Sequence, residues 1–106
     1  MNILLDESAP RLIKTRLAEF SISTVQEMGW TGLKNGELLA LAERQFDVFI
    51  TADQQLRYQQ NLAGRRLAIL VLPGNQVPMV SRLLPMIAQT LRDMAPGTFV
   101  ELPLPL

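Results

Sequence analysis

Cysteine and histidine are both missing from this chain of 106 residues. Without cysteine the chain has no disulfide, no thiolate metal ligand and no thiol nucleophile. Without histidine it has neither imidazole ligands nor the commonest general base. The groups that remain for chemistry at neutral pH are mainly the carboxylates of ten aspartate and glutamate residues. Any active site in this sequence must therefore be built mainly on carboxylates.

The chain also lacks a net charge and a long apolar run. Ten lysines and arginines balance the ten acids, so the overall charge does not indicate a nucleic-acid or membrane binder, and any such binding must be local. No apolar stretch approaches the roughly 20 residues of a membrane span, and the start MNILLDE is charged too early for a signal peptide. We therefore expect a cytoplasmic protein that does not contact a membrane.

Hydrophobic residues are plentiful, at 48% of the sequence, whereas charged residues make up 19%. A chain of this length fits one domain with one core, so we take residues 1–106 as a single domain. The apolar C-terminal segment TFVELPLPL exceeds what a core of this size needs and favours a contact with a partner protein or with a second copy. A homodimer is one expectation.

Short apolar runs alternate with helical patterns along the chain. The apolar runs predict strands over residues 2–5, 22–25, 47–51, 68–72 and 98–102. Ser8 and Asn35 are the predicted N-caps of the first two helices. A short polar helix is predicted over 54–63 and a long one over 79–94. This alternation predicts an α/β domain with a mostly parallel sheet and right-handed crossovers.

Prolines and apolar character predict where two of the strands lie. The run 68–72 is wholly apolar, as a strand covered on both faces requires. Pro103 and Pro105 confine the last strand to an edge. In such sheets ligands bind beyond the carboxyl ends of the strands, where the strand order reverses.

Three acids are candidates for that place. Asp6 follows the first predicted strand, Asp53 follows the third, and Glu37 lies in the first turn of the helix between the second and third. If the first and third strands are neighbours, Asp6 and Asp53 share one edge. Carboxylates brought together repel unless a cation lies between them, and Mg²⁺ or Mn²⁺ takes such oxygen ligands. Each acid also has a simpler interpretation as a helix cap or a first-turn charge, so only the three together favour a metal site.

Three segments resemble one family. LLDES-P, NGELLALAE and FDVFITADQQL, in this order and spacing, are similar to the PIN-like toxin family of small bacterial proteins, over residues 1 to about 72. The resemblance implies a three-layer α/β/α sandwich around a mostly parallel sheet of four to five strands. It also implies an endoribonuclease that depends on Mg²⁺ or Mn²⁺ and acts as the toxin of a toxin–antitoxin system. RNA would be the substrate and a small antitoxin protein the partner.

The resemblance also implies roles for individual residues. Asp6 and Asp53 would bind the metal, and Glu37 would bind it or orient a water, so that these three acids form the catalytic set. Side chains that would hold the acids in place are those of Glu7, Asn35, Thr51 and Gln55. Contacts to the RNA backbone would come from Arg11, Lys14, Arg57, Arg65 and Arg66, with Tyr58 or Trp30 stacking on an unpaired base.

Two positions depart from the family pattern. Many relatives have Asp where Asn35 and Gln55 stand here, which predicts weaker metal binding. The alternative function is a catalytically degenerate PIN-like domain that acts by binding a protein partner. A receiver-type domain with Asp53 as phosphoacceptor is less favoured, because that chemistry usually needs a lysine after a later strand and this chain has only Lys14 and Lys34. The arginine run 57–66 can equally be a solvated face, and Trp30 can equally pack into the core.

Overall fold

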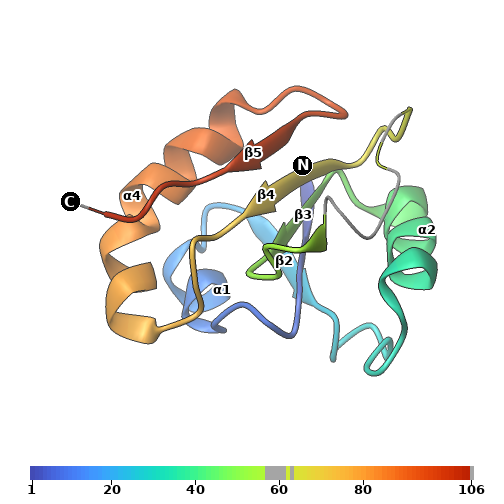
Figure 1. Cartoon of the computed structure of the whole chain (residues 1–106), viewed down its shortest axis with the longest axis horizontal. Helices are drawn as coiled ribbons and strands as arrows, with labels where there is room; N and C mark the ends of the chain where they lie inside the picture. Colours follow the sequence, from blue (N-terminus) through green and yellow to red (C-terminus); the bar gives the residue numbers. More distant parts are fainter. Residues whose placement is uncertain (57–61, 63, 106) are drawn as a thin grey trace.

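One parallel sheet organises the chain (Figure 1). The computed structural model describes residues 1–56, 62 and 64–105. The strand order is β2-β1-β3-β4-β5, and each neighbouring pair runs parallel. The strands are β1 (Asn2–Leu5), β2 (Ser21–Thr24), β3 (Val48–Thr51), β4 (Ala68–Val71) and β5 (Phe99–Glu101). All five predicted strands are therefore present, within one residue at each end, and the sheet is parallel throughout.

The described helices lie on both faces of this sheet. They are α1 (Leu12–Arg16), α2 (Asn35–Gln45) and α4 (Val77–Asp93). α1 and α4 pack together on one face, whereas α2 covers the other, as Figure 1 shows. In the described part of the chain, no helix is both long enough and apolar enough to cross a membrane. The chain is thus an α/β domain with a helical layer on either side of the sheet.

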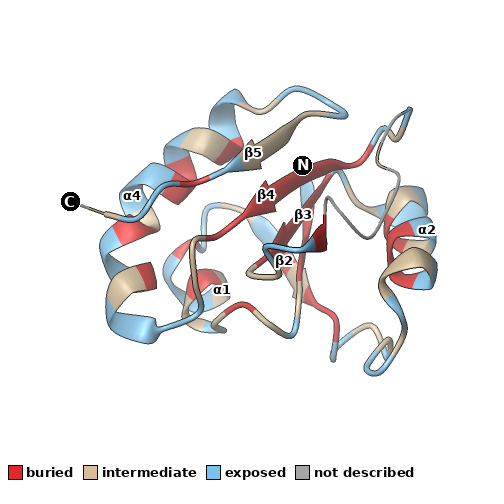
Figure 2. Ribbon diagram, in the orientation of Figure 1, coloured by how far each residue is buried: buried red, intermediate tan, exposed pale blue. Residues whose placement is uncertain are grey.

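The alternation of side chains along the strands divides the core in two. Val48 and Ile50 of β3 belong to the cluster under α1 and α4, whereas Phe49 between them belongs to the cluster under α2. This follows from the period of two in a strand. β3 and β4 are buried at every position (Figure 2), which explains why both read as continuous apolar runs.

The strand order reverses beside β1. From β1 the chain crosses to β2 on one side and then passes to β3 on the other side. The predicted neighbourhood of the first and third strands is therefore confirmed. The point between the carboxyl ends of β1 and β3 is the switch point at which parallel α/β sheets usually bind ligands. β5 lies at an edge, as its following prolines predict.

The predicted helix caps are wrong. α1 starts at Leu12 with Arg11 as N-cap, and α2 starts at Asn35 with Lys34 as N-cap; neither N-cap makes a side-chain capping hydrogen bond. Ser8 and Asn35 bind carboxylates instead. A hydroxyl or amide close to an acid gains a charge-assisted hydrogen bond, which is stronger than a bond to a neutral backbone group. The predicted helix over 54–63 falls mostly outside the described residues.

Candidate functional site

A buried hydroxyl links the acids that follow β1 and β3. Asp6 comes directly after β1, and its N–H donates to the carbonyl of Ile50 in β3 at 2.9 Å. Thr51, the last residue of β3, is 1% exposed. Its hydroxyl donates to Oδ2 of Asp6 at 2.8 Å and accepts the N–H of Asp53 at 3.0 Å. The fold therefore brings Asp6 and Asp53 to one place, as predicted, with Thr51 between them.

A second hydroxyl binds the same carboxylate oxygen. Ser8 donates to Oδ2 of Asp6 at 2.6 Å and accepts the N–H of Ala52 at 3.0 Å. The two hydroxyl oxygens, of Ser8 and Thr51, are 3.2 Å apart. Sequence reasoning missed Ser8, because a serine before a proline has the pattern of a helix cap. Its place in the segment LLDES-P, two residues after the first acid, was the signal of its role.

Asp53 is held by two nitrogen donors. The side-chain amide of Asn35 donates to Oδ2 at 3.2 Å, and the backbone N–H of Gln55 donates to Oδ1 at 3.0 Å. Asn35 is the first residue of α2, so the start of this helix lies at the same edge of the sheet as the two acids. Asn35 and Thr51 thus lie where they were predicted to support the acids. Gln55 reaches Asp53 through its backbone.

Glu37 and Glu7 do not join this pair. Glu37 is exposed in the first turn of α2. It lies two residues after Asn35, about 200° around the helix axis, so the two side chains point in nearly opposite directions. Glu7 is exposed and accepts the N–H of Gly32 at 3.4 Å. Within the described residues, no three acids are grouped so that they could hold a metal ion. The predicted three-acid cluster is therefore reduced to a linked pair.

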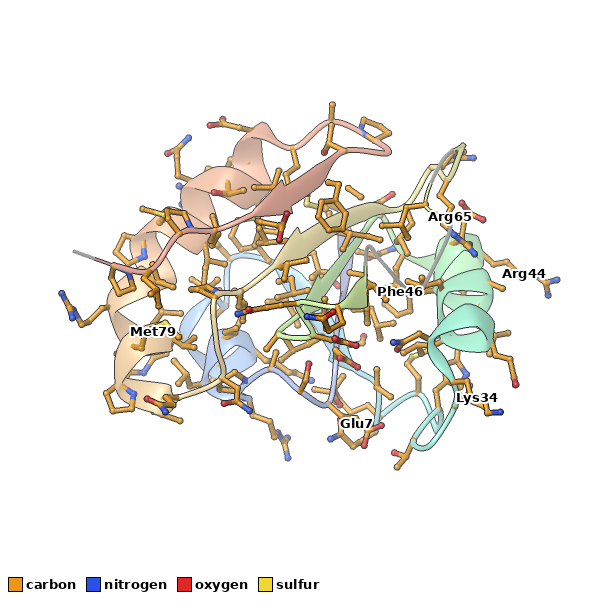
Figure 3. The ribbon with its side chains drawn as sticks, viewed as in Figure 1. Glu7, Lys34, Arg44, Phe46, Arg65 and Met79 are labelled. Carbon is orange, nitrogen blue, oxygen red and sulfur yellow. The ribbon has the colours of Figure 1, made fainter. Side chains whose placement is uncertain are left out.

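Two of the candidate RNA contacts lie at the other end of the sheet. Arg65 and Arg66 precede β4, whose first residue pairs with Val48 at the start of β3. Figure 3 shows Glu7, the neighbour of Asp6, at the lower edge of the view and Arg65 at the upper right. Arg65 forms an ion pair with Glu43, with 3.5 Å between Nη1 and Oε2. The structure does not bring these two arginines together with the acids.

The candidates on and before α1 lie nearer to the acid pair in the sequence. Arg11 is exposed. Lys14 donates to both carboxylate oxygens of Glu27 at 2.6 Å. The Lys14 hydrogen bond, followed by that from the backbone of Thr24, lowers the pKa of Glu27 to about 2. Lys14 is therefore held in an ion pair, whereas Arg57 lies outside the described residues.

Of the two aromatic residues proposed to stack on RNA, one packs into the protein. Trp30 lies edge-to-face against Phe46, with 6.1 Å between ring centroids and 83° between planes. Both rings pack against the core cluster under α2. This favours the core interpretation of Trp30. Tyr58 lies outside the described residues.

A cavity of about 340 Å³ lies beside the end of α4 and β5, lined among others by Thr90 and Val100, and two smaller cavities lie at opposite ends of the sheet. One of about 290 Å³ lies at the amino ends of the strands, lined among others by Met1, Phe46, Asp47 and Arg66. The other, of about 220 Å³, lies at the carboxyl ends of β4 and β5 and includes Gln54, the neighbour of Asp53. Neither of the two larger cavities is lined by Asp6 or Asp53, so volume alone does not identify the site. The switch point and the hydrogen-bonded pair do so.

No protein-family model, curated protein or solved structure matches this chain.

Proposed function

We propose that this chain is a PIN-like endoribonuclease that depends on Mg²⁺ or Mn²⁺ and acts as the toxin of a toxin–antitoxin system. One observation carries the proposal. Asp6 and Asp53 follow neighbouring parallel strands at the switch point of the sheet and are linked through the hydroxyl of Thr51. The resemblance of the three acid-bearing segments to the PIN-like toxin family supplies the reaction and the substrate.

The donor atoms at this edge suit a hard divalent cation. They are carboxylate, hydroxyl and amide oxygens, and the chain has neither thiolates nor imidazoles. Mg²⁺ commonly keeps several waters and binds proteins through only one or two carboxylates together with substrate phosphates. Two linked acids therefore fit such an ion, although fewer charges predict weaker binding than a full cluster would give.

In this mechanism the chain's own residues hold the metal, fix its carboxylate ligands and contact the RNA. Asp6 and Asp53 would hold the metal, which would polarise the scissile phosphodiester and activate a water for attack. Thr51 and Ser8 fix the carboxylate of Asp6, and Asn35 fixes that of Asp53. Glu37, exposed at the start of α2, would orient solvent or the RNA rather than bind the metal. Arg11, which is exposed and follows the carboxyl end of β1, would contact a phosphate.

A second function is favoured by a specific contact. Asn35 donates an amide to Asp53 where many relatives of the PIN-like family have an acid, and this contact satisfies Asp53 without a metal. A catalytically degenerate PIN-like domain that works by binding a protein partner would have this arrangement. Apolar side chains available for an antitoxin or a second copy include Val77, Met86 and Leu104, which are 55%, 44% and 66% exposed.

An RNA cleavage assay separates the two functions. Purified protein is incubated with single-stranded RNA with Mg²⁺, with Mn²⁺ or with EDTA, and wild type is compared with Asp6→Ala. The nuclease predicts cleavage that needs the metal and the acid. Thermal unfolding provides a second measurement, because a metal that binds the native state raises the melting temperature. A wild-type protein that neither cleaves RNA nor gains stability from millimolar metal would favour the degenerate domain.

A further inference from the structure

The hydroxyls of Ser8 and Thr51 at the acid pair each have a defined hydrogen-bond donor and acceptor. A hydroxyl carries one proton, and Ser8 and Thr51 each use theirs on Oδ2 of Asp6. Each hydroxyl oxygen in turn accepts a backbone N–H, from Ala52 and Asp53 respectively. The 3.2 Å contact between the hydroxyls is therefore not a further hydrogen bond. Two chains of donors, each starting at a backbone N–H, end on the same carboxylate oxygen.

The two carboxylate oxygens of Asp6 therefore differ in their hydrogen bonds. Oδ2 accepts two short hydrogen bonds, of 2.6 and 2.8 Å. Among the described residues, none donates a hydrogen bond to Oδ1. Asp6 is only partly buried. Oδ1 is therefore the oxygen left for an external ligand.

We infer that Ser8 is a positioning residue for metal binding by Asp6. This inference rests on the proposed function and gives a role to Ser8, a residue of the segment LLDES-P to which the family resemblance assigned none. Ser8 lies on the loop between β1 and α1, while the N–H that it accepts belongs to Ala52, just after β3. By bonding Asp6 and Ala52 at once, Ser8 ties the loop to the end of the neighbouring strand. It fixes the carboxylate of Asp6 with Oδ2 occupied and Oδ1 left for the ion.

Thr51 alone would not hold the carboxylate as firmly. A single hydrogen bond to Oδ2 leaves the carboxylate able to turn about that bond, whereas two donors from different segments define its plane. Partners that orient a metal ligand in this way typically change metal affinity by 10- to 100-fold when they are removed. Ser8→Ala should therefore weaken metal binding without removing any ligand.

The experiment compares wild type with Ser8→Ala, Ser8→Thr and the control Ser81→Ala, whose serine is exposed on α4. Free Mn²⁺ is measured by electron paramagnetic resonance during titration of each protein. Amide hydrogen exchange of Ala52 is followed in the metal-free proteins. Ser8→Ala should weaken Mn²⁺ binding about 10-fold and speed exchange at Ala52 about fivefold or more. Ser8→Thr should restore both, and Ser81→Ala should change neither.

The outcomes separate this inference from the proposed function. If wild type binds Mn²⁺ and Ser8→Ala binds it equally well, Ser8 is only a structural residue and the inference is overturned while the nuclease proposal stands. Faster exchange at Ala52 without weaker Mn²⁺ binding leads to the same conclusion. If wild type itself binds no Mn²⁺ and cleaves no RNA, both proposals are overturned.

Discussion

The two ends of the sheet hold their acids in different ways. At the amino ends, Glu43 accepts the backbone N–H of Arg66 at 2.9 Å and pairs with the guanidinium of Arg65. Asp47 at the same end accepts the N–H of Asn2 at 2.7 Å. At the carboxyl ends, Asp6 and Asp53 are held by hydroxyl, amide and backbone N–H groups. Among the described residues, neither of these two acids has a cationic partner.

This difference separates structural acids from candidate ligands. An acid paired with an arginine has its charge compensated within the protein, as Glu43 does. The hydroxyl of Thr51 joins the carboxylate of Asp6 to the backbone N–H of Asp53, and acids at one edge of a sheet gain from a cation that comes from outside. Cavities of about 290 and 340 Å³ lie at the amino ends and beside α4 and β5, but the two acids that share a hydroxyl lie at the carboxyl ends. The hydrogen-bonded link between the two acids is therefore a better guide to the site than cavity volume.

The strongest test replaces one acid at each end. Asp53→Ala removes a proposed metal ligand, so RNA cleavage should fall by more than the roughly 100-fold seen for supporting residues. Asp47→Ala removes an exposed acid of the same sheet at the opposite end and should change the rate by no more than about twofold. Initial rates of cleavage of a fluorescent RNA in saturating Mn²⁺ measure both. Equal losses in the two variants would show that the two ends do not differ in function.

Removing the buried hydroxyl should have the next largest effect. Thr51→Val keeps the shape of the side chain but leaves the N–H of Asp53 without its acceptor and takes one donor from Asp6. We expect a loss of about 1–3 kcal/mol in the free energy of unfolding, measured by urea denaturation without metal. Thr24→Val is the matched control, because Thr24 is 3% exposed at the end of β2 and accepts the N–H of Glu27.

The two threonine variants should differ most when metal is present. Both lose a buried hydrogen bond, but only Thr51 touches the acid pair. Mn²⁺ should therefore still raise the melting temperature of Thr24→Val by the wild-type amount, and raise that of Thr51→Val by less. Identical shifts with Mn²⁺ in both variants would contradict the assignment of Thr51 to the site.

Asn35→Asp introduces the acid that many relatives in the PIN-like family have at this position. Unlike the variants above, it should strengthen metal binding at the carboxyl ends of the sheet. Without metal, the new carboxylate replaces a donor to Asp53 by a like charge, which should lower stability by about 1 kcal/mol or more. With Mn²⁺, the third carboxylate should tighten binding by roughly 10-fold. Calorimetric titration measures the affinity, and Asn75→Asp, in an exposed loop, controls for the added charge. Unchanged affinity in Asn35→Asp would place the metal elsewhere.

The fold could be predicted from the sequence further than the site could. Runs such as AILV and VFIT have one interpretation in an α/β pattern, because apolar residues on both faces require cover on both faces, and both form the expected strands. The location of Asp6 and Asp53 followed from strand order in the same way. What Ser8 and Asn35 bind could not be predicted, because a short polar side chain before a helix can cap the helix or bind an acid with similar local patterns. Only the spatial proximity of β1, β3 and α2 decides between these options.

The smallest expected effect concerns Lys14 and Glu27, an exposed ion pair away from the acid pair. The pKa of Glu27 is lowered from 4.5 to about 2, chiefly by the hydrogen bond from Lys14. Because the folded state has the lower pKa, this pair contributes stability above pH 4.5 and loses it as the pH falls toward 2. Lys14→Gln should therefore flatten the decline in stability between pH 4.5 and 2, by a small amount because the pair is exposed.

Urea denaturation of wild type and Lys14→Gln at pH 5, 3 and 2 measures this flattening, and Lys34→Gln, at an exposed lysine before α2, controls for the lost charge. The same variants separate two roles of Lys14. If Lys14→Gln flattens the pH dependence and leaves RNA cleavage unchanged, Lys14 acts through Glu27 alone and the phosphate contact predicted for it is wrong. If cleavage falls in Lys14→Gln and not in Lys34→Gln, Lys14 exchanges Glu27 for a phosphate of the RNA. The bound RNA then extends from the acid pair along α1.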